Sequence, residues 1–144
     1  VASDIFAIYF SNFSAHQIEY EGVLYPTVEH AFHCARYSQA KIRAEILAAR
    51  SPEMAWKVSQ NHKKVQNPNF NDQKRKIMKE LLRAKVEQHE IVRKALLDTG
   101  DTPIIKHVVT FPPGNGFWDD GANGEGRNEM GKILMEIREE LQLG

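Results

Sequence analysis

The sequence contains a single cysteine, no long apolar run and no excess of charge of either sign. The lone Cys34 excludes an internal disulfide and a multi-cysteine zinc site. No stretch approaches the roughly 20 apolar residues that a membrane span needs, and the first residues lack the order of a signal peptide. Lysine plus arginine and aspartate plus glutamate each number 19. These absences predict a protein of the cytoplasm, or alternatively of the nucleus, without a membrane partner.

The length and the apolar pattern predict one domain over residues 1–144, with an α+β fold that is mainly helical and carries a small antiparallel sheet. Strands are expected at residues 5–10, 17–20, 23–25 and 103–110, with a hairpin turn at Gly22. Helices are expected at residues 27–35, 40–49, 52–57 or beyond, and 72–97, and from Asn128 onward. Residues 61–71 are typical of a loop, and the helical period allows a break near His89.

Charge is unevenly distributed along the neutral chain. Residues 57–94 hold eleven basic and four acidic side chains, a net charge of 11 − 4 = +7. Such a segment favours an anion-facing surface, although solvated helix faces rich in lysine explain it equally well.

Glycine is concentrated near the end of the chain, where six of the nine glycines fall within residues 112–132. A glycine-rich loop that leads into a helix start offers free backbone N–H groups for a phosphate, while a flexible surface loop is the ordinary alternative. The loop matches neither the P-loop nor the GxGxxG pattern. Within it, Trp118 could stack on a planar base or serve as a structural residue. Asp120 could position a ribose hydroxyl or a water, or be a solvated turn residue.

Glu29 is the strongest catalytic candidate because it lies in the first turn of the helix that Thr27 is expected to cap. The helix dipole stabilises a charged carboxylate there, as a nucleophile or an oxocarbenium stabiliser requires, but first-turn glutamates also occur for local reasons. The neighbouring His30 and His33 do not complete a zinc motif, and no metal is expected.

Lys85 lies on the apolar stripe of the helix predicted at residues 72–97. The usual explanation is a side chain that snorkels to solvent. A lysine directed into a pocket would instead bind a phosphate, or attack a ring-opened ribose as a Schiff-base amine.

Several motifs together resemble the NADAR family over about residues 10–141. The resemblance rests on Phe10-Ser11-Asn12-Phe13, Tyr25-Pro26-Thr27-Val28-Glu29-His30-Ala31-Phe32, Ala84-Lys85, Trp118 with Asp120-Gly121, and Gly126-x-Asn128-x-x-Gly131-x-Ile133-Leu134-Met135. The order and spacing of these motifs match from end to end.

The resemblance implies hydrolysis of an N-glycosidic bond without a cofactor. It points to ADP-ribose attached to guanine, with ADP-ribosylated DNA or a nucleotide as partner, or to ribosylated pyrimidine phosphates of riboflavin synthesis. A non-catalytic ADP-ribose reader is the third possibility. The resemblance places Glu29, Asp120 and Lys85 at catalytic positions. The residues expected to bind substrate are Asn12, Phe13, Arg36, Phe70, Trp118, Gly121, Gly126, Asn128 and Gly131.

A few positions depart from the family pattern, and they concern the substrate rather than the reaction. The family often has Gln where this chain has His33, Lys-Phe where it has Arg36-Tyr37, and Gly where it has Asp119. It usually has Trp at the position of Phe70 and Glu at the position of Lys106. Arg36 keeps the positive charge and is expected to hold a phosphate bidentately.

Overall fold

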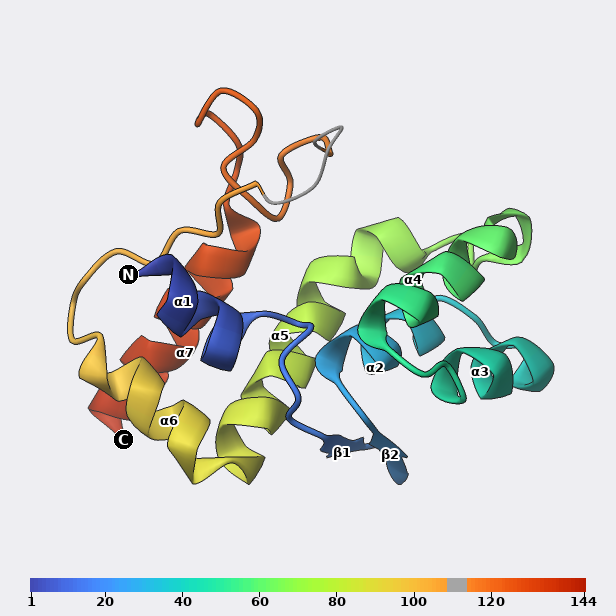
Figure 1. The fold of residues 1–144 in the computed structure, drawn as a ribbon, viewed down its shortest axis with the longest axis horizontal. Coiled ribbons are helices and arrows are strands. Elements are labelled where there is room, and N and C mark those ends of the chain that lie inside the picture. Colours follow the sequence, from blue (N-terminus) through green and yellow to red (C-terminus); the bar gives the residue numbers. More distant parts are fainter. Residues whose placement is uncertain (109–113) are drawn as a thin grey trace. The chain divides into compact units, whose positions relative to one another are not determined.

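The computed structural model describes residues 1–108 and 114–144, which form two compact units. The central unit comprises Ser11–His89, and the terminal unit comprises Val1–Phe10 with Glu90–Gly144. The helices and strands of both units are labelled in Figure 1. The prediction of one domain over residues 1–144 stays a prediction. In the described part of the chain, no helix is both long enough and apolar enough to cross a membrane.

The central unit contains the only sheet found among the described residues, a two-stranded antiparallel hairpin. Strands β1 (Ile18–Tyr20) and β2 (Val23–Tyr25) pair Ile18 with Tyr25. Glu21 and Gly22 both adopt positive φ angles, 51° and 80°, as the tight turn of a right-twisted hairpin requires. The predicted hairpin and the mainly helical α+β class are confirmed.

Helix α2 (Val28–Cys34) begins where predicted, because the Thr27 side chain accepts a hydrogen bond from the backbone N–H of His30. All seven of its residues are buried. The helix packs against α5 and against the pair formed by α3 (Ala40–Leu47) and α4 (Pro52–Asn61); Figure 1 shows it between them. A helix buried on every side must satisfy its polar side chains inside the protein.

A single 19-residue helix, α5 (Phe70–Gln88), forms the longest element of the central unit. His89 is extended and ends it, and α6 (Glu90–Asp98) follows, so the break predicted near His89 is confirmed. The loop predicted at residues 61–71 contains a short 3-10 helix, Lys63–Val65. The start of α5 at Phe70 also lies inside that predicted loop.

The strand predicted at residues 5–10 is wrong. The terminal unit opens with helical turns, α1 (Ser3–Ile5) and a π-helical turn at Phe6–Phe10. The rings of Phe6 and Phe10, four residues apart, meet edge to face at 6.0 Å on one side of these turns. A six-residue apolar run has no decisive period, so packing against α6 determined its conformation.

The strand predicted at residues 103–110 is also wrong for residues 103–108, which have no regular structure; residues 109 and 110 lie outside the described part. This segment pairs with a side chain rather than with a strand. Asn128 accepts a hydrogen bond from the N–H of Lys106 at 2.9 Å and donates one to the carbonyl of Ile104 at 3.0 Å. The segment is thereby held beside the start of α7 (Glu129–Leu143).

Gly131 allows this close contact. A Cβ at Gly131 would lie 2.1 Å from the carbonyl oxygen of Ile104, and the Asn128 side chain would be within 2.6 Å. Ile104 is fully buried, so its backbone has little freedom to move away.

We therefore predict that Gly131→Ala destabilises the protein by about 1–3 kcal/mol, the usual cost of overpacking a close contact. Urea unfolding measures the change in the free energy of unfolding. Gly114→Ala is the matched control because its Cβ would meet nothing within 4 Å. Equal stability of the two variants would contradict the packing role of Gly131.

Candidate functional site

Segment 11–14 links α2 to α5 within the central unit. The carbonyl of Asn12 accepts the backbone N–H of Glu29 at 3.1 Å. The Lys85 amine donates to the carbonyl of Ser11 at 3.0 Å and to the hydroxyl of Ser14 at 2.5 Å. Three residues predicted for the site, Asn12, Glu29 and Lys85, are therefore held around one four-residue segment.

Glu29 is buried and takes part in a chain of polar side chains. Its Oε2 lies 2.9 Å from Nε2 of His33, one turn further along α2. Nδ1 of His33 in turn accepts a hydrogen bond from Nε of Arg36 at 3.0 Å. Within residues 1–108 and 114–144, the second carboxylate oxygen of Glu29 has no hydrogen-bond partner. These side-chain contacts fix one oxygen of Glu29, while the other oxygen has no partner among the described residues.

Arg36 is anchored by the protein itself. Its Nη1 donates to the side chain of Gln66 at 2.9 Å, and its guanidinium lies 5.1 Å from the ring centre of Phe32 and 4.5 Å from that of Phe70. Because Nε and Nη1 both have protein partners, these two groups are not free for the expected bidentate grip on a phosphate. Burial lowers the pKa of this guanidinium.

Phe70 and Phe13 lie in different surroundings. Phe70 is 2% exposed and packs edge to face on Phe32 at 5.3 Å, so in this structure it supports Arg36. Phe13 is 49% exposed, as an aromatic residue available to a planar ligand would be. Substrate contacts of both rings stay predictions.

Lys85 does not snorkel to solvent, which corrects the ordinary expectation from its place on the apolar stripe. The residue is 1% exposed, and its amine donates hydrogen bonds to the uncharged oxygens of Ser11 and Ser14. Burial lowers the pKa of the amine to about 7. A large fraction of the Lys85 amine is therefore neutral near pH 7.

Asn12 provides a polar atom that the protein leaves unsatisfied. The residue is 7% exposed, and among the described residues its Oδ1 is buried without a hydrogen-bond partner. An orphan acceptor of this kind is costly unless a ligand or water donates to it. A hydroxyl or amide N–H group of a substrate would meet this need.

In the terminal unit, Asp120 fastens the glycine-rich loop to residues 106–108. Its Oδ1 accepts the backbone N–H of Val108 at 2.9 Å, and its Oδ2 lies 2.6 Å from Nδ1 of His107. The hydrogen bond from His107 lowers the pKa of this carboxyl group. His107, which is 61% exposed at its side chain, was missed in the sequence because the pair spans thirteen residues without a recognisable motif.

The backbone N–H groups at the start of α7 are not free, which corrects the expected phosphate cradle. Those of Gly126, Arg127, Asn128, Glu129 and Met130 donate to carbonyls of residues 116–120, at 2.6–3.2 Å. A Cβ at Gly126 would lie 2.4 Å from the carbonyl oxygen of Asp119, so this glycine is needed for loop closure. The Asn128 side chain makes no cap hydrogen bond, because it binds residues 104–106 instead. Substrate contacts of Gly121, Gly126, Asn128 and Gly131 stay predictions.

Trp118 lies beside the same loop and is only partly buried. Its ring meets that of Phe117 edge to face at 4.7 Å, and its carbonyl accepts the N–H of Met130. The backbone is therefore fixed while part of the indole stays accessible, as base stacking would need.

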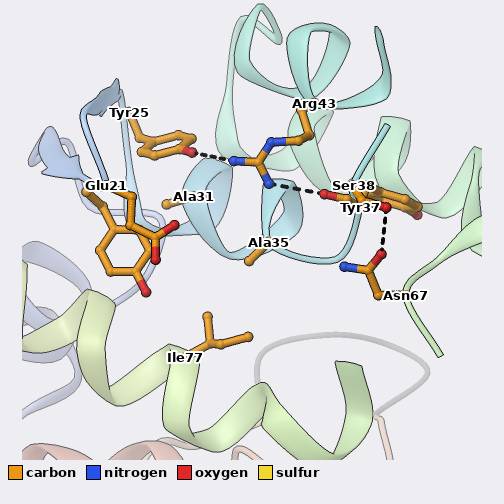
Figure 2. A pocket seen from close by; sticks show the side chains of 10 residues that line it. Glu21, Tyr25, Ala31, Ala35, Tyr37, Ser38, Arg43, Asn67 and Ile77 are labelled. Atoms are coloured by element: carbon orange, nitrogen blue, oxygen red, sulfur yellow. Dashed lines mark hydrogen bonds between the residues drawn. The ribbon is translucent and has the colours of Figure 1, made fainter. Parts of the chain in front are cut away.

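A second feature of the central unit is a cavity of about 420 Å³ on the side of α2 that carries Ala31 and Ala35, away from Glu29 and His33. Figure 2 shows these alanines opposite Ile77 of α5. The Arg43 guanidinium beside it binds the Tyr25 hydroxyl at 3.2 Å and backbone carbonyls of residues 34 and 37. This cavity could not be predicted from the sequence, because the residues that line it come from separate elements.

The predicted site residues fall into two sets, each within one unit. The central unit holds Asn12, Phe13, Glu29, Arg36, Phe70 and Lys85, and the terminal unit holds Trp118, Asp120, Gly121, Gly126, Asn128 and Gly131. In the described part of the chain, histidine, cysteine and carboxylate side chains do not gather in a group of three that could hold a metal ion.

Known proteins share the fold and much of the sequence of this chain. The NADAR domain model matches residues 3–142. N-glycosidase YbiA of Shigella flexneri is 37% identical over 134 residues, which are 93% of this chain and 81% of that protein. Riboflavin biosynthesis protein VVA0006 of Vibrio vulnificus is 31% identical over 93% of this chain and 35% of that protein. The NMR structure of E. coli YbiA superposes with a TM-score of 0.82 at 36% identity, covering 93% of this chain and 77% of that one.

The family model spans nearly the whole described chain, and the relative named N-glycosidase is covered over most of its length. The same fold recurs in the solved YbiA structure. The chain is therefore a hydrolase of N-glycosyl bonds and belongs to the NADAR family.

Proposed function

We propose that this N-glycosidase removes ADP-ribose from guanine bases of DNA. The observation that carries the choice of substrate is the basic surplus of the central unit, the unit that also holds Glu29. Apart from the buried Lys85, residues 57–88 contain eight basic and three acidic side chains, a net charge of 8 − 3 = +5. Lys57, Lys63, Lys64 and Lys76 are exposed there. A surface of this kind attracts a polynucleotide through its phosphates.

In the proposed reaction, Glu29 acts at the ribose carbon that is bonded to guanine. Its free oxygen stabilises the oxocarbenium-like carbon or directs a water molecule onto it, while guanine leaves with a proton. The unpartnered Oδ1 of Asn12 accepts a hydrogen bond from a ribose hydroxyl. Trp118 stacks on the base, and Asp120 orients the ribose; both assignments rest on the family resemblance.

Lys85 supports a covalent variant of the same reaction. The neutral amine attacks the sugar carbon of the ring-opened N-glycoside, and the guanine nitrogen leaves with a proton, so that an imine joins the sugar to Lys85. Water then hydrolyses the imine, which releases the sugar and restores the amine. The low pKa and the hydrogen bond to Ser11, the neighbour of Asn12 in the chain, support this variant.

The alternative substrate is a ribosylaminopyrimidine phosphate of riboflavin synthesis. The likeness to the Vibrio vulnificus riboflavin biosynthesis protein favours it. The two substrates differ in how many phosphates they present to the protein. Binding of DNA should weaken steeply with salt, whereas binding of a small monophosphate should not.

We predict that Glu29→Gln lowers kcat by roughly 10²–10⁴-fold, because the amide cannot stabilise positive charge or activate water. Glu53→Gln is the matched control, since Glu53 is an exposed first-turn acid of α4. Release of ADP-ribose from guanine-ADP-ribosylated DNA, and of the base from the pyrimidine substrate, is followed by mass spectrometry. Binding of ADP-ribose without release of product by the wild type would leave a reader and overturn the proposed activity.

Reduction with cyanoborohydride during turnover tests the imine. We predict that it attaches the sugar to Lys85 and that the trapped fraction rises as the pH passes through about 7, because the buried amine becomes neutral there. A lysine with an ordinary pKa would require a pH above 10. Lys85→Gln should abolish the adduct. Normal turnover without any adduct would restrict the reaction to the direct attack of water.

The role of Asn12 can be tested separately. We predict that Asn12→Leu, which removes the orphan acceptor, raises KM for the ADP-ribosylated substrate roughly tenfold, the effect of losing one hydrogen bond to a buried group. The same substitution should preserve or raise thermal stability, because it removes an unsatisfied buried oxygen. An unchanged KM would exclude Asn12 from substrate binding.

A further inference from the structure

We infer that His33 is a positioning residue for Glu29, held in one neutral tautomer by Arg36. The inference rests on the catalytic role proposed for Glu29 and goes beyond it, because it assigns a task to His33, Arg36 and the residues that hold Arg36. His33 contacts the carboxylate and is 2% exposed, so it acts on the reaction through Glu29.

The chemistry of the guanidinium decides where the proton of His33 lies. Arginine can only donate hydrogen bonds, and its Nε lies 3.0 Å from Nδ1 of His33. Nδ1 must therefore carry a lone pair, which places the single proton of the neutral ring on Nε2. That proton points at Oε2 of Glu29, 2.9 Å away. A second proton on Nδ1 would face the donor group of Arg36 and break that hydrogen bond.

Arg36 can set this tautomer only if it cannot move, and the structure fixes it on several sides. Its guanidinium lies against the adjacent rings of Phe32 and Phe70, and Gln66 accepts a hydrogen bond from Nη1. The carbonyl of Arg36 also accepts the N–H of Asn67 at 2.8 Å. The connection between α4 and α5 thereby fixes Arg36. Arg36 in turn binds His33, and His33 binds Glu29.

A second buried histidine on α2 makes a natural comparison. His30 is 1% exposed, and its ring nitrogens contact the Thr27 hydroxyl at 2.8 Å and the Ala49 carbonyl at 2.9 Å. It satisfies its hydrogen bonds without touching a carboxylate. Replacing His30 therefore measures what the loss of a buried histidine from this helix costs, apart from any effect on Glu29.

The tautomer can be observed directly by ¹⁵N NMR of the histidine rings in the full chain, with single variants to assign the signals. We predict that His33 of the wild type is neutral with its proton on Nε2. In Arg36→Met, which keeps an unbranched apolar stem against the two phenylalanine rings but loses the donors, Nε2 should keep its proton because it still faces the Glu29 carboxylate, and Nδ1 should take up a second proton. A proton on Nδ1 in the wild type, or an unchanged ring in Arg36→Met, would overturn the inference.

Kinetics tests the consequence for catalysis. Glutamine offers one acceptor and one donor as the imidazole does, so His33→Gln should keep kcat within a few-fold of the wild type. His33→Leu should lower kcat roughly 10–100-fold with little change in KM, the range observed when the partner that orients a reactive group is removed. His30→Leu controls for general damage to α2. Arg36→Met provides a second variant in which the histidine itself is kept, and its kcat should fall as in His33→Leu.

The outcomes separate this inference from the proposed function. Full activity of Glu29→Gln would overturn the catalytic role of the glutamate, whatever the His33 variants do. An inactive Glu29→Gln beside a fully active His33→Leu would overturn the positioning role alone. Equal loss of kcat in His33→Gln and His33→Leu would also overturn it, because the paired acceptor and donor would then not be what matters.

Discussion

Helix α2 is buried on every side, and it nevertheless carries a glutamate and two histidines. Burying such groups without partners costs several kcal/mol, so every polar atom on this helix must find a hydrogen bond inside the protein or in a ligand. Its neighbours are arranged accordingly. Thr27 and Ala49 satisfy His30, while Arg36 and Glu29 satisfy His33. The remaining oxygen of Glu29, whose side chain is 11% exposed, has no hydrogen-bond partner among the described residues.

The same constraint applies to segment 11–14. Its backbone carbonyls accept the backbone N–H of Glu29 and the amine of Lys85, so the amine is held by an oxygen that carries no net charge. The amine is buried and none of its hydrogen bonds goes to a carboxylate. Burial therefore lowers its pKa to about 7. Asn12, in the same segment, has a buried oxygen without a hydrogen-bond partner among the described residues. A shifted pKa and an unsatisfied buried atom are typical of functional sites rather than of stabilising contacts.

Features set by neighbouring residues could be predicted from the sequence. The cap at Thr27 and the hairpin turn at Gly22 were found because each depends on a few adjacent positions. Glu29 was selected for the same reason. The family resemblance supplied Asn12, whereas Lys85 was also singled out by its place on an apolar stripe; its contact with Ser11, 74 residues away, was not predicted.

Contacts between distant segments could not be predicted in this way. Asn128 was expected to cap its own helix and instead binds residues 104–106, which replaces the strand expected there. Arg36 was expected to hold a phosphate, but Gln66 and Phe70, brought in by the next connection, occupy it. In both cases the partner of the residue depended on tertiary packing that a local pattern does not contain.

The central claim is that the bond broken is the one between the ribose and the guanine nitrogen. Mass spectrometry of nucleosides from an ADP-ribosylated oligonucleotide, digested after incubation with the wild-type protein, tests it most directly. The account predicts that unmodified deoxyguanosine is restored and that intact ADP-ribose is released. Guanine that still carries a ribosyl or phosphoribosyl group would show cleavage elsewhere in the ADP-ribose and would contradict the account.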